Sequence, residues 1–309
     1  MGLAEPDRAD LGLFGPDSVT WRVHAEPILW LAALRALFLQ MLLPRAIAGV
    51  VQNSAFREDP WGRLFRTAQF FGQVIYGDVA TAQAAGARVR RRHARMRGVD
   101  PVTGAGFHID EQELLRWVHV TAAESFCSTA RRGGLRLTDA EVDQYYAEQL
   151  AVAELVGLAT ETVPVTAREV EAYYRQMRPR LRLSPDAAAA ARFLALPTFP
   201  WGLGFTPVRP LWIGVAAYGF SLLPPWARRL YGLPGLPSTD LAATLTSRSV
   251  RLALRALPTR LLEGPIYQNA MARAERAFSM TRNTGESATI PSARAAGMRR
   301  PRVDRPPRR

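Results

Sequence analysis

The sequence predicts an all-α protein, a single multi-helix globular domain with a disordered C-terminal tail. Apolar residues recur at helical spacing along nearly the whole chain, whereas Val-, Ile- and Thr-rich stretches of alternating apolar and polar residues are missing. Three pairs also show the capping-box pattern, in which an Asp or Thr begins a helix and a Glu follows three residues later: Asp110 with Glu113, Thr138 with Glu141, and Thr166 with Glu169.

The expected helices follow from this periodicity. The first four are predicted at about residues 27–43, 45–54, 60–75 and 79–97, with Pro44 separating the first from the second. The three capping pairs open the next helices, and the one that Thr138 opens is expected to stop near Gly157. Beyond residue 183 frequent prolines predict short helices. The domain is expected over residues 20–282, between an N-terminal segment (1–19) and a polar, basic, disordered tail (283–309).

Composition limits the functional classes. The 309 residues are 48% apolar and 22% charged, as in globular proteins with a sizeable core. The net charge is +13, but residues 271–309 alone carry ten arginines against three acids, and the chain contains no lysine. Because phosphate-tracking surfaces usually mix lysine and arginine, we expect solvated arginines and no specific nucleic-acid partner. The one cysteine, Cys127, excludes an intrachain disulfide and is expected to be buried and inert.

Hydropathy argues against membrane spanning. No stretch reaches the ~20 uninterrupted apolar residues of a spanning helix. The nearest is interrupted by Arg35 and Gln40, and residues 211–226 predict a buried or interfacial helix. The N-terminus is acidic and lacks the basic and apolar regions of a signal peptide. We therefore expect a cytoplasmic protein that could contact a membrane peripherally, with no obligate protein partner.

Histidine is the main source of candidate chemistry, because P-loop, G-x-S-x-G, H-E-x-x-H and C-x-x-C motifs are absent. The four histidines (His24, His93, His108 and His119) include no pair at helical i, i+4 spacing, so a zinc site is not indicated.

His119 lies inside the apolar run "LLRWVHVTAAESF", with Leu115, Ala122, Ala123 and Phe126 on its helix face. On the residues alone, a core histidine is the favoured interpretation. The alternative is an axial haem ligand, because the two alanines leave room for the edge of a flat ring.

A second candidate lies in "GARVRRRHARMRG". In a helix Arg90, His93 and Arg97 share one stripe, at positions i, i+3 and i+7. The stripe could be a solvated surface. It could also hold an acid–base group beside an anion, such as a haem propionate or an oxygen-derived ligand, with arginine supplying fixed donors. The spacing does not separate these alternatives.

Four segments resemble one known family, in the right order. They are "RALFLQMLLPRAIAGVVQNSAFREDPWGRLFRT", "RVRRRHARMRG", "LLRWVHVTAAESF" and "LTDAEVDQYYAEQ". The family is that of MpaB-type oxygenases and rubber oxygenases (latex-clearing proteins), and the resemblance covers roughly residues 20–260. The "WVHxT" segment and the upstream "RxxH" are its most specific parts.

The resemblance implies an all-helical fold that binds haem b. It implies that His119 is the proximal ligand of the iron and that His93 lies on the distal side, where rubber oxygenases have a lysine. Arg90 matches their distal arginine. The family's better-known chemistry is cleavage of a carbon–carbon double bond in an isoprenoid chain by dioxygen.

The chain also departs from the family pattern. Leu43 precedes Pro44 where many relatives have a histidine, Glu111 follows Asp110 where relatives often have proline, and Ala94 replaces a distal threonine. The match for iron binding is therefore stronger than the match for double-bond cleavage. The sequence predicts a haem-dependent oxygenase acting with dioxygen on an apolar, isoprenoid or lipid-like small molecule. The alternatives are a non-catalytic haem-binding or peroxide-handling protein and a cofactor-free membrane-surface protein.

Overall fold

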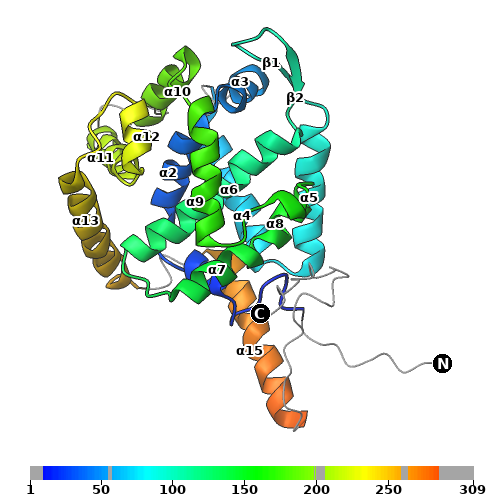
Figure 1. Ribbon diagram of the computed structural model, residues 1–309. Coiled ribbons are helices and arrows are strands. Elements are labelled where there is room, and N and C mark those ends of the chain that lie inside the picture. The colour runs from blue at the N-terminus through cyan, green and yellow to red at the C-terminus, as the bar shows by residue number, and fades with distance from the viewer. Residues whose placement is uncertain (1–9, 55–57, 198, 200–205, 259–263, 285–309) are drawn as a thin grey trace, which may run out of the picture.

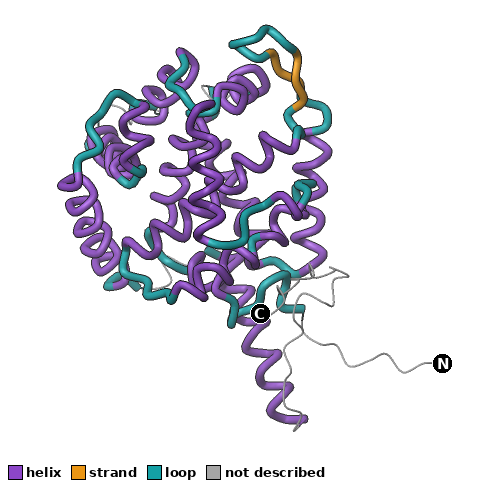
Figure 2. Tube along the Cα trace, viewed as in Figure 1, coloured by secondary structure: helices purple, strands orange, loops and turns teal. Residues whose placement is uncertain are grey.

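The computed structural model describes residues 10–54, 58–197, 199, 206–258 and 264–284, and their regular secondary structure is almost entirely helical (Figures 1 and 2). The α-helices are α1 (Val19–His24), α2 (Leu29–Met41), α3 (Pro44–Asn53), α4 (Pro60–Tyr76), α5 (Val79–His93), α6 (Gln112–Arg132), α7 (Asp139–Glu148), α8 (Leu150–Leu155), α9 (Ala167–Met177), α10 (Pro185–Ala195), α11 (Val208–Ser221), α12 (Pro225–Leu230), α13 (Pro237–Arg255) and α15 (Pro265–Thr284). Two short 3₁₀ helices, η1 (Thr160–Thr162) and η2 (Arg178–Arg180), complete the helical elements. The all-α prediction is confirmed.

Helix α6 runs through the middle of the molecule and organises the other elements (Figure 1). Helix α2 packs along it, while α4 and α5 lie on one side and α11, α12 and α13 lie on the other. Trp117 of α6 is fully buried in the largest apolar cluster, where Tyr173 and Tyr174 of α9 stand against its ring. The core therefore fixes the rotation of α6 about its axis, and with it the direction in which His119 points.

The four helices predicted at the start of the domain correspond to α2, α3, α4 and α5, and they follow the predicted boundaries closely except at the end of α5. Helix α1 was not predicted. Pro44 occupies the first turn of α3, where its missing N–H costs nothing. Helix α5, however, ends at His93 and not at residue 97. The chain then forms a short antiparallel hairpin of β1 (Arg97–Val99) and β2 (Gly106–His108), which the periodicity did not predict.

The hairpin depends on a close approach that is not visible in the sequence. Gly98 pairs with Phe107, whose ring is fully buried. A Cβ atom on Gly98 would lie 2.5 Å from the Phe107 ring, so only glycine fits at this position.

The three predicted helix starts had different outcomes. Thr138 and Glu141 form the complete capping box at α7. The Thr166 hydroxyl accepts from the Glu169 N–H as predicted, but the Glu169 carboxylate accepts from Val165 and not from Thr166. The box predicted at Asp110 is wrong. Helix α6 begins after Glu111, whose carboxylate accepts hydrogen bonds from His108 and Arg45.

The helix predicted from Thr138 to Gly157 is interrupted at Gln149, which separates α7 from α8. The Gln149 side-chain amide donates to the Thr20 hydroxyl at 3.0 Å, and this tertiary contact accompanies the break. The stop near Gly157 is confirmed. Gly157 has a φ of +84°, and Leu158 N–H donates back to the Ala153 carbonyl, as in a glycine C-cap.

Several prolines past residue 183 lie at helix starts, where they do not limit the length of the helix. Pro185, Pro225, Pro237 and Pro265 all lie in first turns, and α13 and α15 have 19 and 20 residues, so the prediction of short helices is wrong for these two. Residues 285–309 of the predicted tail lie outside the described residues, as does the start of the N-terminal segment.

No single helix among the described residues is long and apolar enough to cross a membrane. Helices α2 and α3 reach that length and hydropathy only as a pair, which is bent by 106°.

Candidate functional site

His119 lies seven residues into α6, and its side chain is buried, with 9% of the residue exposed. Burial disfavours the charged imidazolium and lowers the pKa of His119 to about 4. The ring makes no hydrogen bond to any other described residue. At neutral pH it is therefore an uncharged imidazole with a free nitrogen lone pair, the form that binds a metal ion.

The flanking residues of the "WVHxT" segment hold this part of α6 in place. The indole N–H of Trp117 donates to the Gln40 carbonyl of α2 at 3.2 Å. The Thr121 hydroxyl donates to the Trp117 carbonyl one turn earlier, at 2.7 Å. Because successive helical residues are about 100° apart, Trp117 and Thr121 face the α2 and α9 side while His119 points away from it.

Apolar groups mark both ends of the face that carries His119. One turn earlier, Leu115 packs in a cluster with residues of α8. Two turns later, the Phe126 ring lies 4.8 Å from His24 of α1 and 5.0 Å from Phe71 of α4. The imidazole thus lies between apolar groups along this face of the helix.

Next to this face the helix is less well covered. Val118 is 42% exposed, although α6 runs through the middle of the molecule, and Ala122 is partly exposed while Ala123 is buried. On α2, the Gln40 side-chain amide donates to the Val118 carbonyl. Ala122 and Ala123 place small side chains beside His119 on this helix, and their role in holding a cofactor stays a prediction.

His93 forms the last residue of α5, and its ring is largely buried. Its Nδ1 atom is buried without a hydrogen-bond partner among the described residues. Burial and the nearby Arg92 lower the pKa of His93, against an opposing effect of Asp110. Since Asp110 lies just before α6, His93 lies near the N-terminal end of that helix, about 10 Å along the axis from the level of His119 by helical rise.

The Arg90 guanidinium makes a hydrogen bond within the protein. It donates to the Leu155 carbonyl at the end of α8, and its aliphatic carbons pack on Gly157. The next loop is joined to α6, because the Gln112 side chain donates to the Gly157 carbonyl at 2.9 Å. Arg90 therefore ties α5 to the α8 end that packs beside α6.

Arg97 lies outside the stripe that the sequence predicted. Helix α5 has ended before it, and Arg97 is an exposed residue of β1 whose Nη1 donates to the carbonyls of Ala94 and Met96. The prediction that Arg90, His93 and Arg97 share one helical stripe is therefore wrong. The cofactor-binding role of Arg97 stays a prediction.

Sequence reasoning missed a second histidine, partly buried, beside the His119 face. The His24 ring shares a hydrogen bond of 3.3 Å with the Tyr145 hydroxyl and stacks among Phe71 and Phe126. This enclosure lowers the pKa of His24 to about 3. Nothing local in the sequence marks it, because all three of its neighbours come from other helices.

A buried ion pair was also missed. Arg35, read from the sequence as an interruption of an apolar run, is 3% exposed and pairs with Glu124 of α6. Glu124 also accepts from the Tyr174 hydroxyl at 3.0 Å. These bonds direct Glu124 away from His119, as expected from its place on the helix. Cys127 is buried as predicted, and burial raises the pKa of its thiol to about 12.

Within the described residues, no group of three or more His, Cys, Asp or Glu side chains is placed to hold a bare metal ion. A single imidazole on an apolar face would suit an iron whose other ligands a macrocycle supplies.

Comparison with known proteins identifies the family of the chain. The family model described as "ER-bound oxygenase mpaB/B'/Rubber oxygenase, catalytic domain" matches residues 21–258, which include α1 to α13 apart from the first two residues of α1. No curated protein and no solved structure matches the chain significantly. The match spans most of the chain, and the protein therefore belongs to the family of mpaB-type and rubber oxygenase catalytic domains.

Proposed function

We propose that the protein is a haem-b-dependent oxygenase that oxidises an apolar, isoprenoid or lipid-like small molecule with dioxygen. The observation that carries the proposal is His119. It is a buried, neutral imidazole without a hydrogen-bond partner among the described residues, and it lies in a chain of the oxygenase family.

The residues around His119 fit a flat, apolar cofactor. His119 would bind the iron through a ring nitrogen, and Ala122 and Ala123 would leave space for the macrocycle edge. The haem would supply the redox chemistry with dioxygen, which no side chain of this protein can supply alone. The apolar groups on α1, α4 and α8 would exclude water and receive an apolar substrate.

His93 and Arg90 have the supporting roles in this proposal. The unpartnered Nδ1 of His93 is available to hold or donate a proton, and its lowered pKa keeps the ring neutral at physiological pH. Arg90 would supply a fixed positive charge to orient the bound oxygen species. In the present arrangement it donates to the Leu155 carbonyl, so this role requires a change of partner. Arg97 would reach an acidic substituent of the macrocycle from β1.

The absorption spectrum of protein reconstituted with haem tests the iron ligand. We expect a Soret band in the wild type that His119→Ala removes or strongly shifts. His108→Ala is the matched control, because His108 is an exposed histidine of β2 and its variant should keep the wild-type spectrum. Haem that fails to bind the wild type, or binds equally to His119→Ala, contradicts the proposal.

Oxygen uptake separates an oxygenase from a non-catalytic haem protein. With haem bound, an apolar alkene should stimulate oxygen consumption in the wild type, and His93→Ala and Arg90→Gln should reduce it. A reconstituted protein with a normal spectrum and no stimulated uptake would favour the carrier or peroxide-handling alternative.

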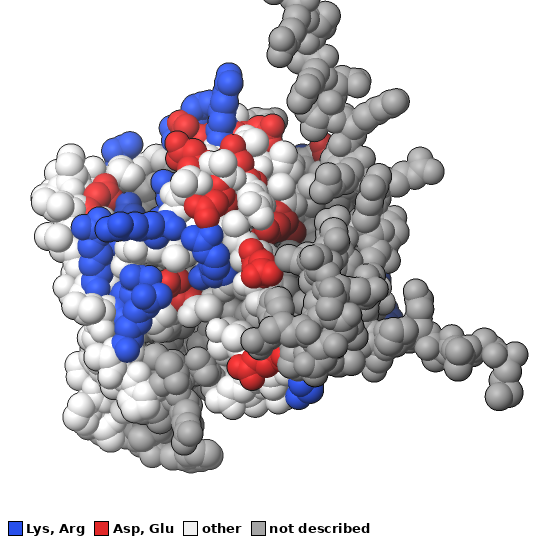
Figure 3. All heavy atoms as spheres, turned by 90° about the horizontal axis from the view of Figure 1, so that it is seen from below, with Lys and Arg blue, Asp and Glu red and all other residues white. Residues whose placement is uncertain are grey.

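Peripheral membrane contact is a second proposal, and the outer faces of α11 and α13 favour it. Leu211 on α11 is 69% exposed, and Leu241, Leu245 and Leu252 on α13 are 54–73% exposed. Exposed apolar residues clustered on neighbouring helices mark an interaction surface. Arginines gather at the same end of the molecule (Figure 3). In a flotation experiment the wild-type protein should float with the vesicles, and changing Leu245 and Leu252 to serine should abolish this co-flotation.

A further inference from the structure

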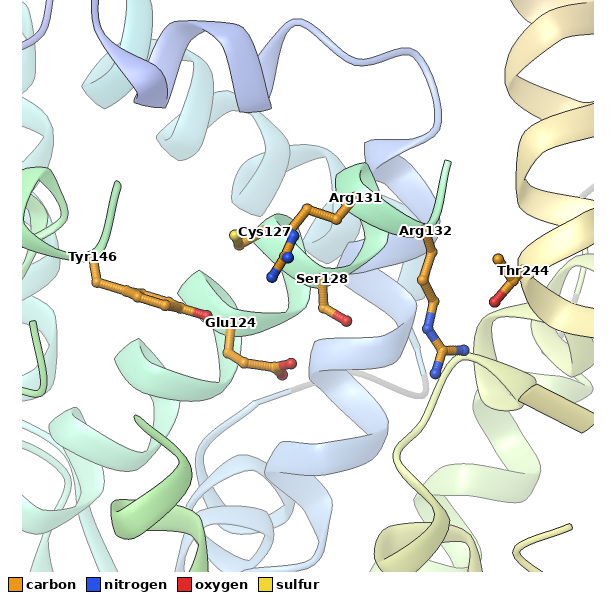
Figure 4. Close-up of a pocket in the computed structure, with 7 residues that line it drawn as sticks. All are labelled: Glu124, Cys127, Ser128, Arg131, Arg132, Tyr146 and Thr244. Carbon is orange, nitrogen blue, oxygen red and sulfur yellow. The ribbon is translucent and has the colours of Figure 1, made fainter. Parts of the chain in front are cut away.

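A cavity of about 410 Å³ opens on the other side of α6 from the Leu115–Phe126 face, near the C-terminal end of the helix. Its walls come from α6, α7 and α13: Glu124, Cys127, Ser128, Arg131, Arg132, Tyr146 and Thr244 (Figure 4). Its volume lies in the usual range for small-molecule sites. Neither the candidate haem site nor the core explains why two arginines line it.

The charges around this cavity are not balanced. Glu124 is neutralised by Arg35, and Asp240 serves two guanidinium groups at once, 3.0 Å from Arg132 and 2.9 Å from Arg228. The Arg131 side chain makes no hydrogen bond or ion pair with the described part of the chain. The cavity therefore carries a surplus of positive charge in the absence of a ligand.

Two more arginines increase this surplus. Arg248 and Arg251 of α13 approach Gly134, just after the end of α6, within 4 Å of the position that a Cβ atom would take there. Glu26 pairs with Arg251 but also with Arg255, so it offsets only one of these charges. In Figure 3 arginine side chains gather at the end of the molecule where α13 lies.

Unused hydrogen-bond donors point to the kind of ligand. The Nη1 atom of Arg132 is buried and has no hydrogen-bond partner among the described residues, although its Nη2 holds Asp240. A buried donor of a charged group without a partner costs free energy, which an acceptor in the cavity would recover. The Ser128 hydroxyl also makes no hydrogen bond within the described residues, and in Figure 4 it lies between the guanidinium groups of Arg131 and Arg132.

We propose that this cavity is a binding site for the phosphate group of a small molecule, either free or as a lipid headgroup. Arg131, Arg132 and Ser128 supply donors from two consecutive turns of one helix, and a phosphate offers several oxygens to accept from them at once. The surplus positive charge favours a dianion over a neutral ligand. Because the site lies away from His119, it does not depend on the proposed oxygenase function.

Binding of inorganic phosphate tests the site. In low-salt buffer of constant ionic strength, phosphate should bind the full chain saturably by calorimetry. Arg131→Gln and Ser128→Ala should each weaken binding, the former by about tenfold, since a hydrogen bond to a charged group is lost. Both side chains are free of partners among the described residues, so these variants should keep the wild-type circular dichroism and melting temperature.

The matched control is Arg175→Gln on α9, an exposed arginine paired only with Glu171. It removes the same charge at a residue that does not line the cavity, and it should leave phosphate binding unchanged.

Vesicles identify the source of the phosphate. Vesicles of phosphatidylcholine with and without phosphatidic acid are compared with inorganic phosphate. Binding of either probe that Arg131→Gln weakens and Arg175→Gln does not supports the site. The stronger of the two probes then shows whether the ligand is a lipid headgroup or a free phosphate. The proposal is overturned if neither probe binds saturably, or if the two arginine variants weaken binding equally.

Discussion

Glu124 and Arg35 form a buried ion pair that joins the two central helices of the molecule. The Arg35 Nη2 atom lies 2.9 Å from the Glu124 carboxylate, and its Nε donates to the Leu222 carbonyl after α11. The Ser125 hydroxyl accepts from the same guanidinium at 2.7 Å. Arg35 and Ser125 are buried and Glu124 is partly buried, so the pair aligns α2 with α6 along the helix that carries His119.

Removing one partner of this pair should be strongly destabilising. Glu124→Gln leaves the guanidinium of Arg35 buried without a counter-charge, and we expect a loss of about 3 kcal/mol in the free energy of unfolding. Urea denaturation monitored by circular dichroism measures it. The double variant Arg35→Met/Glu124→Leu should be less destabilised than Glu124→Gln, because apolar groups then replace both charges.

The exposed pair of Arg175 and Glu171 provides the control for this experiment. Arg175→Gln should change the free energy of unfolding by less than about 0.5 kcal/mol, because exposed ion pairs contribute little. An equally small effect of Glu124→Gln would show that the carboxylate does not stabilise the core.

Acid should destabilise the apoprotein through His119. Because its pKa is about 4 in the folded protein and about 6.5 when unfolded, the unfolded chain binds more protons between these values. Stability is therefore highest above pH 6.5 and falls as the pH drops towards 4. At pH 5 the contribution of this residue amounts to a loss of about 2 kcal/mol relative to pH 7.5.

Urea denaturation of the wild type and His119→Gln at both pH values measures this contribution. The variant has no titrating group at this position, so its stability should fall by about 2 kcal/mol less between pH 7.5 and pH 5. The remaining acid sensitivity should come in part from His24, whose pKa is also lowered. Equal losses in both proteins would mean that His119 titrates normally.

The helix cap at Thr138 gives a smaller and local prediction. Its hydroxyl accepts from the Glu141 N–H, while the Glu141 carboxylate accepts from the Thr138 N–H at 2.8 Å. Thr138→Ala should cost about 1 kcal/mol of stability in urea denaturation. Thr67→Ala is the control, because Thr67 is an exposed residue inside α4 and alanine is at least as favourable there.

The elements that the sequence predicted well depend on local interactions. Helices α2, α3 and α4 follow from apolar periodicity and from Pro44 and Pro60 in first turns. The cap at Thr138 and the stop at Gly157 involve residues within a few positions of each other. Such signals do not need the rest of the fold.

The errors arise where distant segments meet. Arg35 resembled an interruption because its partner lies 89 residues away. The end of α5 and the hairpin depend on Gly98 meeting Phe107, and the break at Gln149 accompanies its bond to Thr20. For the candidate site, burial of His119 followed from its apolar neighbours. The hydrogen bond from Arg90 to the Leu155 carbonyl could not be predicted from the sequence, because tertiary contacts bring α8 to α5.

The close packing of α5 on α8 yields the final prediction, because it positions both Arg90 and His93. Gly86 of α5 is buried against the end of α8, where an added Cβ atom would lie 2.5 Å from the Leu155 carbonyl oxygen. Gly86→Ala must therefore push α5 away from α8, and Arg90 donates to that same carbonyl. We expect a loss of about 1–3 kcal/mol despite the better helix propensity of alanine.

Gly214→Ala separates the two effects of this substitution. Gly214 lies within α11, and a Cβ atom there would meet nothing within 4 Å, so the variant gains helix propensity without a clash. Its melting temperature should equal or exceed that of the wild type, while that of Gly86→Ala falls. If Gly86→Ala were as stable as Gly214→Ala, α5 would be free to shift on α8, and Arg90 could leave the Leu155 carbonyl at little cost. Arg90 could then take the different hydrogen-bond partner that its role in the proposed oxygenase requires.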